Sequence, residues 1–184
     1  IDVVAQAEHG PDGLAWLVTW DESVADAVEA EVAAITGSSP RRGDIESTLA
    51  ASGHVVLVDD VARAIEVVDR IAPEHLQLMV EDAQDVATRV RHAGAIFCGP
   101  WSPASLGDYI AGPSHVLPTS GTARFSGALS VADFTKDIHV VTADQSALAS
   151  LGPHVVALAE AEGLDAHAES VRRRLAAMEE GEDA

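Results

Sequence analysis

The sequence is poor in cysteine and in lysine. Cys98 is the single cysteine in 184 residues, which excludes an internal disulfide framework and a zinc site built from several cysteines. Cys98 ends the apolar run 95–98, where a small buried thiol is the simpler interpretation. Lys136 is the only lysine among 11 basic residues, and we attribute this to compositional bias.

Basic charge is scarce as a whole. Eleven Lys and Arg stand against 30 Asp and Glu, which gives a formal net charge of −19. A surface this acidic repels phosphate, so neither nucleic acid nor an anionic membrane is an expected partner. No apolar run approaches the ~18 residues of a membrane span, and no signal-peptide pattern opens the chain.

Several familiar motifs are missing. No glycine-rich dinucleotide fingerprint follows an expected strand, and there is no phosphate-binding GxxxxGK[ST] loop. This chain alone therefore shows no nucleotide cradle. HExxH and His-x-His are missing too, which disfavours a zinc hydrolase.

Short apolar runs alternate with amphipathic helices along most of the chain. Strand, helix, strand, helix in this rhythm predicts a mostly parallel sheet with right-handed crossovers. The strand at 54–58 is expected to be buried on both faces. The strands are predicted at 14–20, 54–58, 76–79, 93–98 and 138–141. The helices are predicted at 3–9, 21–36, 43–51, 61–71, 81–90, 152–163 and from 165 onward.

The fold class is therefore α/β, followed by a small helical C-terminal domain. We place the main domain at 1–130 and the helical domain at 131–184. Residues 99–130 are rich in Gly, Pro, Ser and Thr, and a loop this long inside a compact domain is usually functional or disordered. Its hydrophobic anchors, such as Trp101 and Phe125, favour an ordered loop.

Four short stretches hold polar residues suited to chemistry. Imidazole and carboxylate are ligands that zinc accepts, and they are also the common acid–base groups. Each stretch also has a simpler interpretation. In chain order, these interpretations are a solvated helix face, a loop salt bridge, a turn or cap residue, and the flank of a helix–helix turn. The candidates are Gln6 with His9, Glu74 with His75, Asp108 with His115, and Glu162 with His167.

Four segments resemble the histidinol dehydrogenase family. They are AQAEH at 5–9, APEHL at 72–76, the long stretch 94–136 that contains GDY and GPSHVLPTSGTARFSG, and EGLDAH at 162–167. They cover essentially the whole chain in the order of the family. A family member is more than twice as long, so the chain, which begins at Ile1 without an initiator Met, is expected to be its C-terminal portion.

The resemblance implies a partial Rossmann-like sheet and a cytoplasmic homodimer that oxidises L-histidinol to L-histidine. The reaction is expected to use NAD, bound mainly by the missing front part, and one zinc per active site. The implied acid–base pair is Glu74 and His75. The implied zinc ligands are Gln6, His9, Asp108 and His167, the last supplied to the partner's site. The implied substrate contacts are Gln6, His9, His75, Asp108, His115, Glu162 and His167.

Two further expectations concern apolar surfaces, one left open by the missing front part and one on a tail too short to form its own core. The strands of residues 14–98 supply only part of a sheet, so an apolar surface is expected to be exposed where the others belong. The stripe Val171, Leu175 and Met178 is expected to pack on the neighbouring subunit, or else back on its own sheet. The alternative to an enzyme portion is a catalytically incomplete, dimer-forming fragment.

Overall fold

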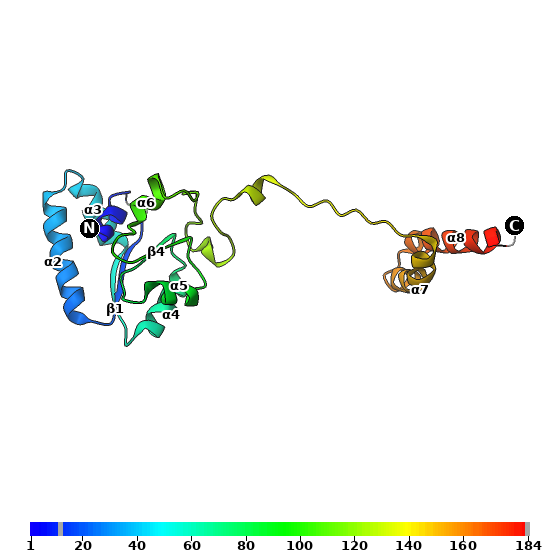
Figure 1. The fold of residues 1–184 in the computed structure, drawn as a ribbon, viewed down its shortest axis with the longest axis horizontal. Coiled ribbons are helices and arrows are strands. Elements are labelled where there is room, and N and C mark those ends of the chain that lie inside the picture. Colours follow the sequence, from blue (N-terminus) through cyan, green and yellow to red (C-terminus); the bar gives the residue numbers. More distant parts are fainter. Residues whose placement is uncertain (11–12, 183–184) are drawn as a thin grey trace. The chain divides into compact units, whose positions relative to one another are not determined.

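The computed structural model describes residues 1–10 and 13–182 (Figure 1). Contacts between Cα atoms divide the chain into two compact units, Ile1–Thr135 and Lys136 onward. The helices are α1 Asp2–Ala7, α2 Glu22–Ser38, α3 Arg42–Ser52, α4 Val61–Ile71, α5 Ala83–Arg89, α6 Ala104–Tyr109, α7 Gln145–Ala161 and α8 Asp165–Glu182. The strands are β1 Ala15–Thr19, β2 Gly53–Leu57, β3 His75–Leu78 and β4 Ala95–Cys98. Short 3₁₀ turns occur at Thr122–Arg124 and Val131–Phe134.

The four strands pair in parallel, as the alternation of strands and helices predicts. β1 pairs with β2, with Ala15 opposite Gly53, and β3 pairs with β4, with His75 opposite Ala95. The predicted α/β class is confirmed. The pairs form two separate two-stranded sheets among the described residues, whereas the sequence suggested one sheet.

Each sheet has its own apolar core within the first unit. Val4 and Ala7 of α1, Ala15 of β1 and Ile45 of α3 form the first core, and Ile45 is fully buried. The second core joins α4, β3 and α5. Its buried members are Val68, Leu76, Leu78, Ala83 and Val86. α1 and β3 both carry candidate site residues, and each is therefore held in place by a different core.

β2 is less buried than the sequence suggests. Val55 and Leu57 are 42% and 51% exposed, so the expectation of burial on both faces is wrong. β2 pairs with β1 alone in the part of the chain that the structure describes, so its second edge has no strand beside it there. A groove of ≈ 760 Å³ with apolar and charged lining lies among α2, α3 and these two strands, and Leu17, Val32 and Glu46 are part of its lining.

The strand expected at 138–141 does not form. These residues are irregular chain, and Ile138, Val140 and Val141 are 73%, 85% and 89% exposed. β-branched residues favour a strand only where a neighbour supplies hydrogen bonds and packing. The described part of the chain places no strand beside them, so composition alone misleads here.

α7 begins earlier than the sequence suggests. Gly152–Pro153 was expected to start the helix, but Asp144 caps it, its side chain accepting the N–H of Ala147 at 2.8 Å. Pro153 therefore lies inside α7, where it removes one internal hydrogen bond. The Asp144 side chain satisfies one of the free backbone N–H groups in the first turn of the helix. A helix that began at Gly152 would leave its first turn without this cap.

α7 and α8 pack on each other in the second unit. Gly152 of α7 is buried, and a Cβ built on it would lie 3.1 Å from both Val171 and Leu175 of α8. Arg172 pairs with Glu160 and Glu169 across and along the helices. Part of the α8 stripe is thus covered by α7.

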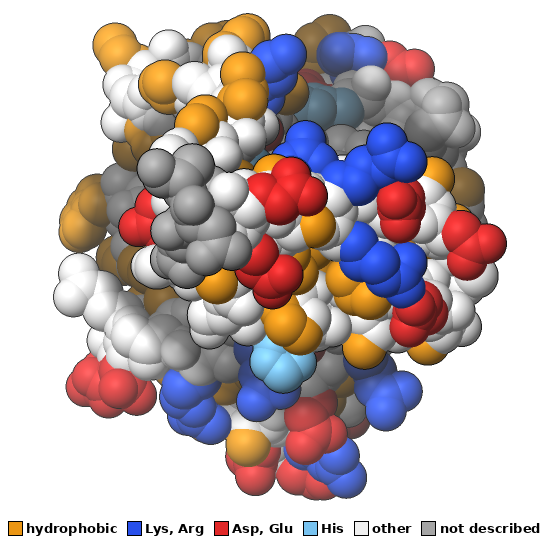
Figure 2. Space-filling view, turned by 90° about the vertical axis from the view of Figure 1, so that its right-hand side faces the viewer, with side chains coloured by type: hydrophobic (Ala, Val, Ile, Leu, Met, Phe, Trp, Pro, Cys, Tyr) orange, Lys and Arg blue, Asp and Glu red, His pale blue; other side chains and the backbone are white. Residues whose placement is uncertain are grey.

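On the molecular face drawn in Figure 2, basic and acidic side chains are interspersed.

Candidate active site

The entry to β3 is held by the backbone on both sides. α4 ends at Ala72, which is buried and adopts the left-handed conformation with φ 51°, and Pro73 follows, which cannot donate a helical hydrogen bond. Glu74 comes next, and its carbonyl accepts the N–H of Ala95 at 2.8 Å. A Cβ on Gly94 would lie 2.6 Å from that carbonyl oxygen, so only glycine allows this approach.

His75 is the first residue of β3 and is almost buried. Its side chain is 11% exposed, and its Nε2 lies 3.4 Å from Oδ1 of Asp108, which is 28% exposed. Both ring nitrogens are buried and have no hydrogen-bond partner among the described residues. A buried polar atom without a partner is rare and costs free energy, so the ring is suited to a ligand that completes its hydrogen bonds.

The pleat of β3 places His75 and Gln77 on one face of the sheet. Nε2 of Gln77 donates to Oδ2 of Asp2 at 3.2 Å, which ties the start of α1 to β3. His75 meets Asp108 of α6 on the same face. The two segments that carry Gln6 and Asp108 are therefore both attached to the face that presents His75.

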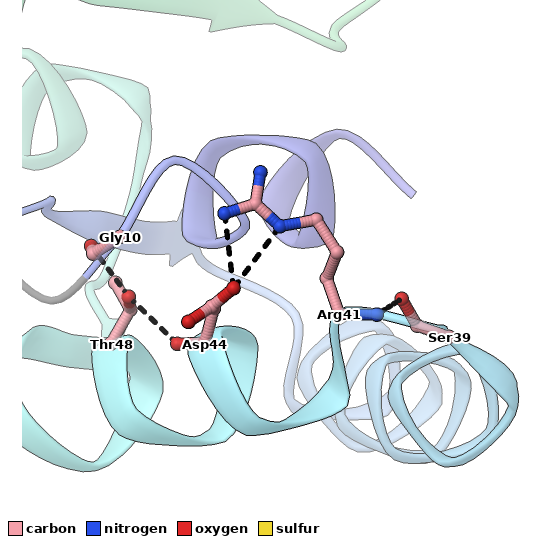
Figure 3. Close-up of polar contacts among 5 residues, drawn as sticks. All are labelled: Gly10, Ser39, Arg41, Asp44 and Thr48. Atoms are coloured by element: carbon pink, nitrogen blue, oxygen red, sulfur yellow. Dashed lines mark hydrogen bonds and ion pairs between the residues drawn. The ribbon is translucent and has the colours of Figure 1, made fainter.

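The segment after α1 is anchored to α3 (Figure 3). The hydroxyl of Thr48, which is fully buried, lies 2.7 Å from the carbonyl oxygen of Gly10. α3 itself is fixed at its start by Arg41, whose guanidinium binds Asp44 at 3.0 and 3.1 Å. Gly10 follows His9 directly, so this hydrogen bond also fixes the backbone next to His9.

The structure places the predicted residues in three groups. Glu74, His75 and Asp108 gather at the entry to β3. Gln6 is half-buried on α1 and His9 is exposed directly after it, while His115 is exposed in the long loop. Glu162 and His167 are exposed at the turn between α7 and α8, in the second unit.

No three His, Cys, Asp or Glu side chains form a metal-binding group within residues 1–10 and 13–182. The predicted zinc ligands are of mixed type and come from both units. Gln6 offers an amide oxygen, and His167 belongs to the second unit. Only His9 and Asp108 are imidazole or carboxylate ligands from the first unit.

Sequence reasoning missed three contributors to this site. The contact of His75 with Asp108 joins two residues that were expected to have separate roles. Phe97 packs on His75, and Gly107 makes room for Phe97. The sequence offers no signal for Gly107, because residues 99–130 are expected to be a loop, where glycine is common, whereas the structure places Gly107 inside α6.

The structure also bears on membrane insertion. Within its described residues, none of the helices combines the length and the apolar character needed to cross a bilayer.

The fold and the site together describe an α/β protein with an imidazole–carboxylate pair at the entry to a parallel strand. The sequence model of histidinol dehydrogenase matches residues 1–175. The chain therefore belongs to the histidinol dehydrogenase family, as the resemblance predicted.

Known relatives match nearly the whole of this chain, but the match covers only part of each relative's own length. Histidinol dehydrogenase of Thermobifida fusca is 50% identical over 175 residues, 95% of this chain and 40% of that protein. The Mycobacterium tuberculosis protein of the same name is 49% identical over 174 residues, 94% of this chain and 39% of its own length. A crystal structure of histidinol dehydrogenase from Elizabethkingia anophelis has a TM-score of 0.88 and 32% identity, covering 97% of this chain and 41% of that one. The chain thus spans about 40% of the length of the curated relatives that it matches.

Proposed function

We propose that this chain is the zinc- and substrate-binding part of a cytoplasmic histidinol dehydrogenase. The reaction oxidises L-histidinol through L-histidinal to L-histidine, the last steps of histidine biosynthesis. The observation that carries the proposal is the contact of His75 with Asp108 beside Glu74, in a chain of this family. NAD supplies the hydride acceptor and is bound mainly by a part of the relatives that this chain does not match.

His75 is the proposed base for the substrate hydroxyl. Histidine is the side chain whose ordinary pKa is nearest neutral pH, so it can take a proton and return it. The ring is mostly shielded from water and its nitrogens lack protein partners, which favours a hydrogen bond to the substrate. Asp108 can hold the orientation of the ring from the other side, as carboxylates do beside catalytic and metal-binding histidines.

Glu74 is the proposed activator of water in the second oxidation. The aldehyde must add water before a second hydride can leave, and the carboxylate accepts the proton that the water gives up. The Glu74 backbone is fixed by Ala95, so its carboxylate starts from a defined position next to His75. Two adjacent titratable groups can then divide the acid and base duties of the two steps.

Gln6, His9, Asp108 and His167 are the proposed zinc ligands. Imidazole nitrogen and carboxylate oxygen are donors that zinc takes, so the chemistry of the set fits the metal. Bound zinc supplies a centre that the amine and imidazole of the substrate can chelate. Glu162 and His115 are proposed to contact the substrate directly.

The helical domain at 131–184 is the proposed dimer-exchange part. Glu162 and His167 are exposed at the α7–α8 turn, so a second subunit can reach them. A mixed dimer of His9→Ala and His167→Ala subunits tests the exchange. Shared sites leave one intact site, so about half of the wild-type zinc and activity should return. Sites built within one chain return neither.

A chimera tests the activity. This chain replaces the matched 39% of the Mycobacterium tuberculosis protein, and histidinol-dependent NADH formation is followed. His75→Asn should lower kcat by about 10²–10⁴ and leave the zinc content near wild type. His139→Asn, at an exposed position in irregular chain, is the matched control and should change neither. Loss of zinc at unchanged kcat would reverse the assignment of His75.

The alternative is a dimer-forming fragment without turnover. It is favoured by the 40% coverage of the relatives. The chain alone then binds zinc and dimerises but produces no NADH, while the chimera is active. A folded, zinc-loaded chimera that stays inactive would refute the enzymatic proposal for these residues.

A further inference from the structure

One aromatic ring lies between the two site segments. Phe97 of β4 stands opposite Gln77 in the parallel register, and therefore on the same face of the sheet as His75. The centroids of the Phe97 and His75 rings are 5.9 Å apart, and the rings are tilted by 43°. Ring separations of 4.5–7 Å are those of favourable aromatic pairs.

The other side of the ring meets α6 at a residue without a side chain. A Cβ built on Gly107 would lie 2.6 Å from Cζ and 2.8 Å from Cε1 of Phe97. Non-bonded carbons prefer about 3.5–4.0 Å, so any other residue would push the ring or the helix away. Glycine inside α6 weakens the helix, and the close approach of Phe97 gives the physical reason for it.

The next residue along α6 is Asp108. Because Gly107 rests on Phe97 and Phe97 rests on His75, the ring acts as a spacer between α6 and β3. On the same side, the His75 imidazole and the Asp108 carboxylate are 3.4 Å apart.

We propose that Phe97 and Gly107 are positioning residues that set the distance between His75 and Asp108. The consequence for catalysis rests on the proposed function, in which His75 takes the substrate proton. A displacement near 1 Å at a reacting group can cost about 10²-fold in rate, so a methyl group at Gly107 has a large expected effect.

The first test uses kinetics of the chimera. Gly107→Ala should lower kcat about tenfold or more, with a smaller change in KM, because it displaces the proposed base rather than removing a binding contact. Adding Phe97→Leu gives the methyl group space, so the double variant should recover most of the lost kcat. Gly43→Ala is the control, since a Cβ there meets nothing within 4 Å.

The second test does not depend on activity. In the NMR spectrum of the 184-residue chain, Phe97→Leu should move the ring-proton resonances of His75 more than those of the other seven histidines. Phe134→Leu, at a ring that is 80% exposed, is the control and should leave His75 unmoved.

The two tests separate the possible failures. If the ring-proton resonances of His75 do not move in Phe97→Leu, the inference is overturned, whatever the activity of the chimera. Moved resonances with an unchanged kcat in Gly107→Ala overturn the positioning role while leaving the proposed enzyme intact. If the chimera with the unaltered chain makes no NADH, the proposed function fails. The His75 resonances alone then decide whether Phe97 sets the distance between His75 and Asp108.

Discussion

Thr48→Val should destabilise the first unit by the worth of one hydrogen bond. The Thr48 hydroxyl has one proton and lies 2.7 Å from the Gly10 oxygen and 3.1 Å from the Asp44 oxygen, so it donates one bond at a time. The Gly10 oxygen also accepts the N–H of Gly13 at 3.1 Å, so it keeps a partner in the variant. The cost is therefore about 0.5–1.5 kcal/mol, below the roughly 1–3 kcal/mol of an abandoned buried group.

Tryptophan fluorescence in urea measures this loss in the correct unit. Trp16, Trp20 and Trp101 are the three tryptophans, and all lie before Lys136. Thr48→Val should lower the denaturation midpoint with an unchanged slope. Thr119→Val, at an exposed position of the same unit, is the matched control. An unchanged midpoint would refute the anchoring of Gly10, and a loss well above 3 kcal/mol would refute the single-bond account.

Three other substitutions test the packing and the caps. Ile45→Ala removes a fully buried side chain and should cost about 2–5 kcal/mol in the same assay, whereas Ile110→Ala, 81% exposed in the same unit, should stay within about 0.5 kcal/mol. Gly152→Ala should lower the α7–α8 melting temperature in circular dichroism because its methyl group meets Val171 and Leu175 of α8. Gly37→Ala, in α2 of the first unit and with open space around its Cβ, should leave that melting temperature unchanged; equal effects would contradict the packing. Hydrogen bonds from Ala147 and Ser146 hold the pKa of Asp144 below its ordinary 3.8, so its stabilisation is present above that pH and is lost as the pH falls through the lower folded value. Acid should therefore weaken α7–α8 less in Asp144→Ala than in the wild type, and parallel melting curves across pH would show that the cap contributes nothing.

Local chemistry made most of the fold predictable. α4 is bounded at Asp60, whose side chain accepts the N–H of Arg63, and at Pro73, and the sequence places both limits correctly. The parallel pairing of β3 with β4 follows from the crossover helix between them. These features depend on residues that are close together in the sequence, so the sequence alone is enough to predict them.

The two errors have different physical origins. The apolar run at 138–141 has strand composition, but a strand needs a partner that composition does not reveal. Gly152 was interpreted as a helix start, although its missing side chain serves the packing of Val171. The strand at 138–141 fails for want of a partner elsewhere in the chain, whereas the start of α7 is set by the local cap at Asp144.

The first limit also applies to the site. Glu74, His75 and Asp108 could be chosen from their types and context. That His75 and Asp108 lie 3.4 Å apart could not, because α5 and β4 separate β3 from α6 along the chain, and the sequence does not show how the chain returns. Phe97 looks like an ordinary core residue in sequence, and only its position against Gly107 gives it another role.

The scarcity of lysine has a practical consequence for protein chemistry. Lys136 is the only lysine, it is the first residue of the second unit, and it lies in exposed irregular chain that runs to Asp144. A protease that cuts after lysine has one peptide bond to cleave, and exposed irregular chain is where such enzymes act most readily. Limited digestion at Lys136 therefore divides the molecule at the junction of its two units, and each half can be weighed, titrated with zinc and recombined.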